Sequence, residues 1–470
     1  MKVTQVATCP SEASRKAGRP ALAPELLAAS GARYSRNNEG LASILAKIDP
    51  GNPDRSIDSI FRMVDYGHQS IADMVLVAMF IDGISIWLAY YIWSLCPTAG
   101  GQESSTRYIK VSADVLIPPE VLGIPPSEIP DWRELMNQCF EAYQSSLNTW
   151  EEVARENAAI MGIPQSLLND PSEVAQKKVA RMSRNYAFDR ARYFLPVGAA
   201  TNVMLIMSAR GWVNLCQFLL SHRLPEPQKL GELIRSELEI CAPRILKYAK
   251  RIESNQNVLA DEFERLVRFA RRETRVWEEP LTQCAESAKP FLSVMVPDET
   301  SEEEIANALS HHTNRYAPVG SCLQRTAVRF GWRAVGFAEI RDLNRHRTGS
   351  KYCPQVPNGF YFALDQVPAG ADTHRAHLLE QAKIGRCASA KAHRLLQKPE
   401  PSYIYWSLLG TEYPFEHTTT ADKFIYEAEL RTGLGAHFRY AKHLHEVLAL
   451  WYERFPATRG LVLEGSAEPE

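Results

Sequence analysis

Two short polar clusters in the sequence combine residue types that could bind a phosphate and polarise a carbonyl group. Arg345, His346 and Arg347 stand at the end of a predicted helix. Their cationic or titratable side chains could hold phosphate oxygens there. Cations at the C-terminal end of a helix also interact favourably with the helix dipole, and that structural role is the competing interpretation.

The second cluster follows a loop predicted over residues 96–104. Glu103, Ser105 and Arg107 supply a carboxylate, a hydroxyl and a fork-shaped donor. Such a set suits a nucleotide phosphate together with the edge of a uracil ring. A solvated polar loop is the competing interpretation, so neither cluster identifies a site by itself.

The elements predicted to position these clusters occur in the same order twice. The first half has a strand over 75–82, a helix over 84–95, and helices over about 131–160, 171–190, 199–222 and 227–255. The second half has a strand over 327–332, a helix over 334–347, a loop over 348–359, and helices over about 371–397, 417–432 and 435–454. The sequence therefore predicts a duplicated chain in three parts, with halves at 1–255 and 316–470 and a charged helical connector at 256–315.

Taken together, the two clusters resemble the flavin-dependent thymidylate synthases of the ThyX family. That family carries Arg-His-Arg, seven intervening residues, and then Ser-x-Arg. Here the two parts are split between the halves. The first half has Leu-Cys-Pro at 95–97 but keeps Ser-Thr-Arg at 105–107. The second half keeps Arg-His-Arg at 345–347 but has Gln-Val-Pro at 355–357.

Further resemblances fall mostly in the first half. The segment His68-Gln-Ser70-Ile-Ala-Asp73 resembles the family's flavin motif, although Asp73 is shorter than the family's Glu. Arg210 and Asn214 resemble its flavin-binding helix. The resemblance assigns flavin binding to Ser35, His68, Ser70, Asp73, Arg210, Asn214, His346 and Arg347.

The same resemblance implies a set of nucleotide-binding residues. Arg192 precedes a Leu-Pro pair and Arg431 follows a Leu, as nucleotide-contacting arginines do in the family. The implied substrate-binding residues are Glu103, Ser105, Arg107, Arg192, Arg345 and Arg431. Arg107 and Arg345 are the implied catalytic residues, because arginines near the uracil carbonyl stabilise developing negative charge. Asp342 departs from the family, which has a nucleotide-contacting Gln there.

The resemblance implies an α+β fold: a tandem duplication of the ThyX-type fold, with a mixed sheet and long helices, that makes a pseudo-dimer in one chain. It implies reductive methylation of dUMP at C5 with methylenetetrahydrofolate, reduced FAD and NADPH as electron donor. Because ThyX sites lie between subunits, we expect a homodimer of pseudo-dimers. Two alternatives stay open. One is methylation or hydroxymethylation of another pyrimidine nucleotide, and the other is a non-catalytic nucleotide- or flavin-binding relative.

Composition argues against several other classes of protein. The formal charge of -2 gives no general attraction to nucleic acid. Nine cysteines, none spaced as CxxC, suit reduced thiols in a cytoplasmic protein rather than a zinc site. The scattered histidines lack partners at ligand spacing, so no metal is expected.

The remaining motifs point to neither a classical nucleotide-binding loop nor a membrane protein. No GxGxxG follows a predicted strand, and no Walker A motif occurs. The apolar stretch 75–93 is interrupted by Asp82 and Gly83, so we expect a strand and a buried helix rather than a membrane span. Glu416 and His417 are interpreted as the start of a helix.

Overall fold

The computed structural model describes residues 1–36, 38, 40–49, 51–107, 111–272, 289–297, 300–433 and 435–466. It divides into two compact units, which are described separately. Unit 1 comprises residues 1–104, 115–126 and 198–264. Unit 2 comprises residues 105–114, 127–197 and 265–470.

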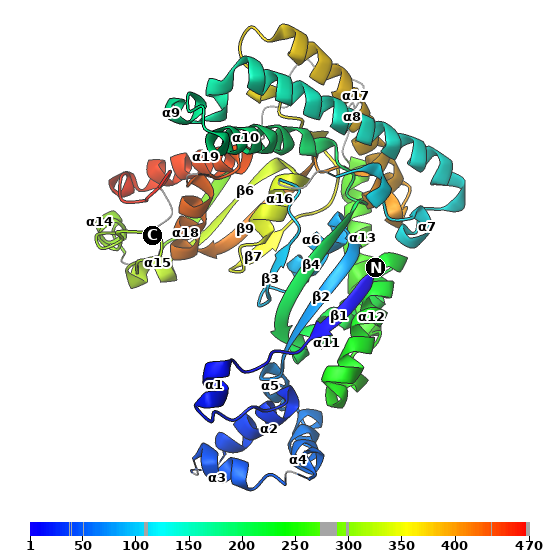
Figure 1. The fold of residues 1–470 in the computed structure, drawn as a ribbon, viewed down its shortest axis with the longest axis vertical. Helices are drawn as coiled ribbons and strands as arrows, with labels where there is room; N and C mark the ends of the chain where they lie inside the picture. The colour runs from blue at the N-terminus through cyan, green and yellow to red at the C-terminus, as the bar shows by residue number, and fades with distance from the viewer. Residues whose placement is uncertain are drawn as a thin grey trace. The chain divides into compact units, whose positions relative to one another are not determined.

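Unit 1 is built on a four-stranded antiparallel sheet in the order β1-β2-β4-β3 (Figure 1). The strands are β1 (Lys2–Val6), β2 (Leu76–Ser85), β3 (Gly100–Glu103) and β4 (Ala200–Ser208). Alternate side chains of β2, such as Val77, Met79 and Ile81, are buried. This alternation is typical of a sheet with one face packed on helices. Trp212 of α11 donates a hydrogen bond to the Val77 carbonyl, so α11 covers that face.

The helices of unit 1 are mostly short. They are α1 (Glu12–Lys16), α2 (Pro24–Tyr34), α3 (Leu41–Ala46), α4 (Pro53–Asp65), α5 (Ser70–Asp73), α6 (Ile86–Leu95), α7 (Pro119–Leu122), α11 (Ala209–Ser221), α12 (Pro225–Cys241) and the first part of α13 (Glu253–Arg272). α11 and α12 pack against each other, and α12 also contacts β1.

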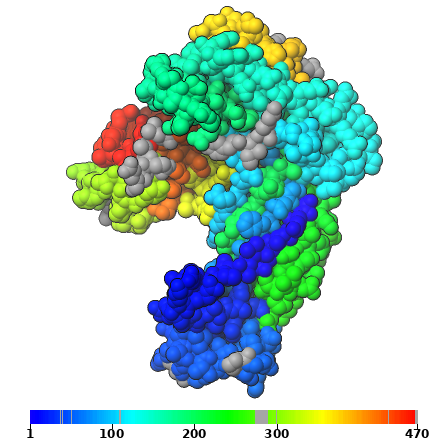
Figure 2. Space-filling model, in the orientation of Figure 1, coloured from blue at the N-terminus to red at the C-terminus, as the bar shows by residue number. Residues whose placement is uncertain are grey.

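Unit 2 has a second antiparallel sheet, in the order β5-β6-β9-β7, with β8 paired to β9. The strands are β5 (Phe291–Met295), β6 (Ala327–Gly336), β7 (Ser350–Tyr352), β8 (Gly359–Phe360) and β9 (Thr411–Thr420). The helices are α8 (Ile129–Glu156), α9 (Gln165–Leu168), α10 (Glu173–Ala191), α14 (Glu302–Asn307), α15 (Ser321–Arg325), α16 (Phe337–Asn344), α17 (Asp372–Gln397), α18 (Ala421–Thr432) and α19 (Phe438–Arg454). α8 packs against α10 and α17, and α8 and α17 are visible in teal and gold in Figure 2.

The two sheets share one order of connection. In each, a long strand with an irregular register leads into a helix, and the next long strand pairs with it and leads into another helix. The register shifts between Ile81 and Ile84 in β2, and between Trp332 and Val335 in β6. Gly83 takes a positive φ of 70° at the first irregularity, a conformation that glycine adopts without strain. The α+β class is confirmed, but both sheets are antiparallel rather than mixed.

Two predicted helix starts are wrong. Residues 200–208 form β4 rather than the beginning of a helix, and α11 starts only at Ala209. Glu416 and His417 lie inside β9, and α18 starts at Ala421. In β4 buried and more exposed side chains alternate, as in a half-buried strand, although residues 203–207 are all apolar. In both places the helix begins after a Ser or Thr at the N-cap position.

The two units do not follow the predicted halves. Residues 127–197 were placed in the first half by sequence, but they belong to unit 2 because α8 and α10 pack with each other and α8 packs on α17. Part of the predicted connector forms α13, β5 and α14, and residues 273–288 lie outside the described residues. Among the helices that the structure describes, none is long and apolar enough to cross a membrane.

Candidate functional site

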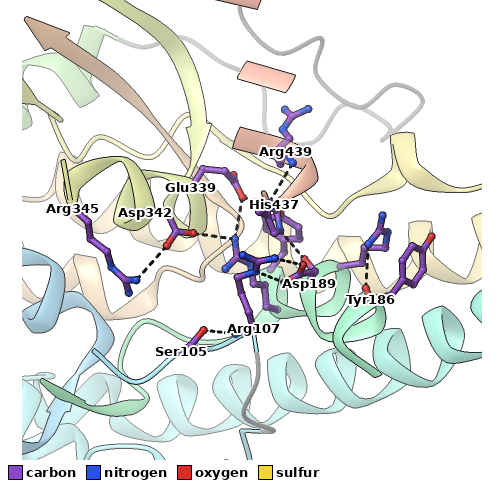
Figure 3. Close-up of polar contacts among 12 residues, drawn as sticks. Ser105, Arg107, Tyr186, Asp189, Glu339, Asp342, Arg345, His437 and Arg439 are labelled. Carbon is purple, nitrogen blue, oxygen red and sulfur yellow. Dashed lines mark hydrogen bonds and ion pairs between the residues drawn. The ribbon is translucent and has the colours of Figure 1, made fainter. Parts of the chain in front are cut away.

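Arg107 lies on a turn of unit 2 and is held by a carboxylate from the last turn of α10. Its backbone N–H donates to Ser105 Oγ at 3.2 Å, which shapes the turn. Its Nε and Nη2 donate to the two carboxylate oxygens of Asp189 at 2.8 and 2.9 Å. This bidentate pair is largely buried and fixes the plane of the guanidinium group (Figure 3).

Arg192 follows α10 directly and is the most deeply buried of the predicted substrate-binding residues, with 2% of its surface exposed. Its Nη2 lies 3.6 Å from Glu339 Oε1 and 3.7 Å from Asp342 Oδ2. Both distances fit ion pairs but are too long for good hydrogen bonds. Nε and Nη2 therefore have no hydrogen-bond partner within the described residues. A buried arginine with unused donors is a feature that a polar ligand would satisfy.

Glu339 and Asp342 reach Arg192 together because they stand one turn apart on α16. Glu339 is fully buried and accepts a hydrogen bond from the Tyr193 hydroxyl at 2.7 Å. Burial raises the pKa of Glu339 to about 7, and the charge of Arg192 offsets only part of this rise. For Asp342, burial would raise the pKa, but Arg192 and Arg345 outweigh it and lower the pKa.

Arg345, at the end of the same helix, and Arg431, from α18, also approach Asp342. Arg345 caps the C-terminal end of α16, and its Nη1 lies 3.7 Å from Asp342 Oδ1. Arg431, in the last turn of α18, donates through Nη2 to the Asp342 carbonyl at 2.7 Å and through Nε to His346 Nε2 at 2.8 Å. His346 accepts this bond and is therefore neutral, because burial lowers its pKa to about 3.

We call Arg107, Arg192, Arg345 and Arg431, with the acids Asp189, Glu339 and Asp342, the arginine cluster. Figure 3 shows Arg107, Asp189, Glu339, Asp342 and Arg345 grouped in one place. Arg107 comes from the first predicted half and Arg345 from the second, yet both belong to unit 2. Of the other predicted substrate residues, Ser105 adjoins Arg107, whereas Glu103 ends β3 in unit 1. Arg347 is exposed just after the cluster.

A second group of predicted residues surrounds a surface hollow of unit 1. Arg210 Nη1 lies 2.9 Å from Asp73 Oδ2, and Asn214 stands one turn further along α11. The hollow, which we call the α5–α11 hollow, is lined by Val64, Gln69, Ala72, Arg210, Val213, Asn214, Gln217, Ile245 and Tyr248. The structure thus brings Asp73, Arg210 and Asn214 together.

The other predicted flavin residues of unit 1 are exposed but are not lining residues of this hollow. His68 and Ser70 flank Gln69, which does line it. Ser35 caps the C-terminal end of α2, and its hydroxyl donates to the Ala32 carbonyl at 3.0 Å.

Several residues of the arginine cluster and its surroundings escaped the sequence motifs. Asp189 stands three residues before Arg192, and Glu339 three residues before Asp342, so each pair shares a helix face. An acid inside the otherwise apolar start of α16 was the available signal for Glu339. His437 is one of the scattered histidines that carry no motif in the sequence. It is fully buried, and its Nε2 donates to the Asp189 carbonyl at 3.3 Å. Burial and the nearby arginines lower its pKa well below the usual value.

Comparisons with known proteins bear on these two groups of residues. Residues 21–244 match the family model described as "Thymidylate synthase complementing protein". A Thermoplasma acidophilum protein, "UPF0159 protein Ta1429", is 25% identical over 446 residues, which cover 86% of this chain and 88% of that protein. Among solved structures, that of a UMP/dUMP methylase PolB from Streptomyces cacaoi bound with 5-Br dUMP matches 53% of this chain and 93% of its own, with 17% identity and a TM-score of 0.30.

Proposed function

We propose, from the premise that residues 21–244 are a domain of the thymidylate synthase complementing (Thy1, or ThyX) family, that the chain is a flavin-dependent pyrimidine nucleotide methylase. The favoured substrates are dUMP and methylenetetrahydrofolate. The observation that carries the proposal is the arginine cluster around the buried Arg192. It joins the Ser-x-Arg of one predicted half to the Arg-His-Arg of the other, and it contains unused donors on Arg192.

The charge of the cluster suits a phosphate monoester. Its four arginines face the carboxylates of Asp189 and Asp342 and the side chain of Glu339, whose pKa is about 7. When Glu339 is protonated, two positive charges remain uncompensated within the cluster. A nucleotide monophosphate carries nearly two negative charges, and a buried arginine binds phosphate through charge-assisted hydrogen bonds. Asp189 would keep Arg107 oriented toward the nucleotide, and Asp342 would do the same for Arg345.

The α5–α11 hollow has a volume of only about 70 Å³, so the residues around it suit contact with one part of a flavin. Val64, Ala72 and Val213 give it an apolar wall. Gln69, Asn214 and Arg210 offer amide groups and a cation for polar ring edges or phosphates. FAD bound there would supply the redox chemistry that turns a transferred methylene unit into a methyl group. The chain's own part is to hold the pyrimidine and to stabilise negative charge on its carbonyl oxygen, which we assign to Arg107 and Arg345.

The repeated order of elements supports a tandem duplication in which each half has kept a different part of the motif. Both sheets have the same strand order and the same position for the irregular register. The Thermoplasma acidophilum relative aligns over 86% of this chain, so a chain of similar extent exists elsewhere. NADPH as electron donor, and a dimer of these chains, complete the proposal.

One observation favours a second candidate, methylation or hydroxymethylation of a different pyrimidine nucleotide. Asp342 is a carboxylate at the centre of the cluster, and its Oδ2 has no hydrogen-bond partner within the described residues. A carboxylate only accepts hydrogen bonds, whereas an amide both donates and accepts. An accepting group would suit the exocyclic amine of a cytosine better than the carbonyl of a uracil. Assays should therefore compare dUMP, UMP and dCMP.

The first test is flavin binding and turnover by the purified chain. We expect a yellow protein, or one that gains flavin absorbance when FAD is supplied, and methylation of the nucleotide with methylenetetrahydrofolate and NADPH. Flavin and nucleotide binding without turnover would favour a non-catalytic relative. A protein that binds neither would exclude the proposed function.

The second test targets the cluster. We expect Arg107→Ala and Arg345→Ala each to abolish turnover and to weaken dUMP binding, because each removes a charge-assisted contact of about 1.5–3 kcal/mol. Arg333→Gln is the matched control, since Arg333 is exposed on β6 outside the cluster. Isothermal titration with dUMP and circular dichroism would separate lost binding from lost fold. Unchanged dUMP affinity in both alanine variants would contradict the assignment.

A further inference from the structure

Unit 1 has a second hollow, beside the first turns of α12 and the residues that follow η5 (Pro243–Tyr248). It has a volume of about 460 Å³, and its lining includes Lys229, Arg235, Lys250 and Arg251, with Glu232 as the lining acid. We call it the α12 hollow. All of its lining residues belong to unit 1, whereas the arginine cluster belongs to unit 2.

The two arginines of the α12 hollow are anchored by main-chain carbonyl groups. Arg235 Nε donates to the Ala249 carbonyl and Arg251 Nε donates to the Leu220 carbonyl, each at 3.1 Å. Ala249 and Leu220 themselves line the hollow. These bonds fix each side chain through Nε and leave its Nη groups available. The Nη groups are the donors that could bind an oxyanion.

The cations of the α12 hollow are not neutralised by the chain. Within the described residues, none of the four forms an ion pair, and Arg235 does not pair with Glu232 although the two stand one turn apart. By contrast, Arg244 of the same unit is neutralised by ion pairs with Glu25, Asp54 and Asp58. Four cations gathered around one acid leave a strong positive potential inside a concave surface, which attracts anions.

We propose that the α12 hollow binds an anion that carries a diphosphate group. A diphosphate offers oxygens on two phosphorus atoms, one for each anchored guanidinium group. It also carries more negative charge than a single phosphate. This suits the hollow, whose four cations outnumber its one acid by three. A nucleoside diphosphate and the diphosphate of a dinucleotide share this chemistry. The proposal does not depend on the nucleotide methylase activity, because no residue of the arginine cluster takes part.

The test is isothermal titration of the full chain with inorganic pyrophosphate and with orthophosphate. The starting protein would carry Arg107→Gln and Arg345→Gln, which weakens any binding of the anion at the arginine cluster. We expect pyrophosphate to bind more tightly than orthophosphate, and its affinity to fall as salt rises. In this background Arg235→Gln and Arg251→Gln should each weaken pyrophosphate binding about tenfold, and together about a hundredfold.

Glutamine is the replacement because its amide N–H can still donate to the same carbonyl group, while the charge and the fork are lost. Arg55→Gln is the matched control, an exposed arginine of α4 on the same unit outside the hollow. Three results would overturn the proposal: no pyrophosphate binding, binding that the double variant retains, or an equal loss in Arg55→Gln. Equal affinity for orthophosphate would overturn the diphosphate class. ADP and NADPH, titrated next, would distinguish the two biological sources.

Discussion

At the scale of single residues, the arginine cluster balances positive and negative groups at short range. Asp189 orients Arg107 through two hydrogen bonds, whereas Arg192 meets its two acids only at 3.6 and 3.7 Å. Arg107 is thus fully engaged with one carboxylate, and Arg192 is charged, buried and short of hydrogen bonds. Burial lowers the pKa of Arg192, but Asp342 and its other partners more than restore it. We expect Arg192 to gain most from a bound phosphate.

If Arg107 and Arg345 act on one transition state, their effects should not add. We expect the Arg107→Ala, Arg345→Ala double variant to lose less turnover than the sum of the single losses, because residues that act as a unit are not independent. Leu95→Ala and Gln355→Ala should leave turnover near the wild-type rate, since they occupy the lost motif positions. Steady-state kinetics of these variants and of the wild type would check this. Full additivity of the two arginines would argue against a shared site.

Glu339 should make nucleotide binding depend on pH near neutrality. Its pKa is about 7, so it is mostly protonated at pH 6 and mostly ionised at pH 8. Ionisation places a negative charge 3.6 Å from Arg192 Nη2, which should weaken the binding of an anion. Glu339→Gln keeps an acceptor for Tyr193 and removes the titration.

The comparison to make is the dUMP affinity of wild type against Glu339→Gln at pH 6 and pH 8. Ionisation of the dUMP phosphate affects both proteins alike, so it cancels in the ratio. As the pH rises from 6 to 8, we expect the dUMP affinity of the wild type to fall roughly 3- to 10-fold relative to that of the variant. A ratio that stays constant across this range would show that Glu339 does not titrate beside the nucleotide.

At the scale of elements, two serines cap the helices that follow the long strands of unit 1. Ser85 Oγ accepts from Leu88 N–H at 2.9 Å and donates to Glu226 at 2.8 Å, fully buried. Ser208 Oγ accepts from Gly211 N–H at 3.1 Å and donates a longer, exposed bond to Asp73 at 3.4 Å. Each cap is worth about 1 kcal/mol, and the bond to the buried Glu226 adds to the first.

We therefore expect Ser85→Ala to lower the free energy of unfolding by about 2–3 kcal/mol and Ser208→Ala by about 1 kcal/mol. Urea unfolding followed by circular dichroism would measure both. The two variants control for each other, because both delete one hydroxyl from the same position of equivalent helices. Equal losses would mean that the buried bond from Ser85 to Glu226 contributes no more stability than the exposed bond from Ser208 to Asp73.

Elements with strong local signals were predictable from sequence. The helix predicted over 84–95 and the long helices α8, α10 and α17 agree with the structure within a few residues. The apolar residues of β4, combined with those of α11, fit a helical repeat, so the sequence predicts a helix there. In the structure these residues form a strand because they pair with β2. Asp189 and His437 could not be found from motifs, because only tertiary packing brings them to Arg107.

At the scale of the whole molecule, buried neutral histidines should make stability fall in acid. Burial lowers the pKa of His222 and His443 to about 4 and that of His346 to about 3, and His437 shifts in the same direction. The unfolded chain, with a histidine pKa of about 6.5, therefore binds more protons than the folded chain below that pH. Stability is complete above pH 6.5 and is lost as the pH falls below it.

At pH 5, each such histidine should lower the free energy of unfolding by about 2 kcal/mol. Glu339 has the opposite effect, because its raised pKa stabilises the folded state as the pH falls below 7. Its contribution offsets the loss of stability caused by roughly one histidine. The net effect is a lower melting temperature at pH 5 than at pH 7.5. In His443→Gln the difference between the two melting temperatures should shrink. A pH-independent melting temperature would contradict the neutral state of these side chains.

The proposed assembly is a dimer of these chains. If each chain supplies two family-like halves, two chains reproduce the four copies that a homotetrameric relative would contain. Light scattering in dilute solution should give twice the mass of 52.9 kDa. A strictly monomeric protein with full turnover would show that the sites are complete within one chain.

The order in which the two units use the chain has a consequence for synthesis. Unit 2 takes residues 105–114 and 127–197 from between segments of unit 1, and the rest of it follows residue 264. On the ribosome, α8 and α10 therefore emerge long before α17, against which α8 packs. The face of α8 that packs on α17 therefore stays uncovered while residues 157–371 are translated, and an exposed apolar face of this kind favours chaperone binding. No single cut after residue 255 would release an intact half.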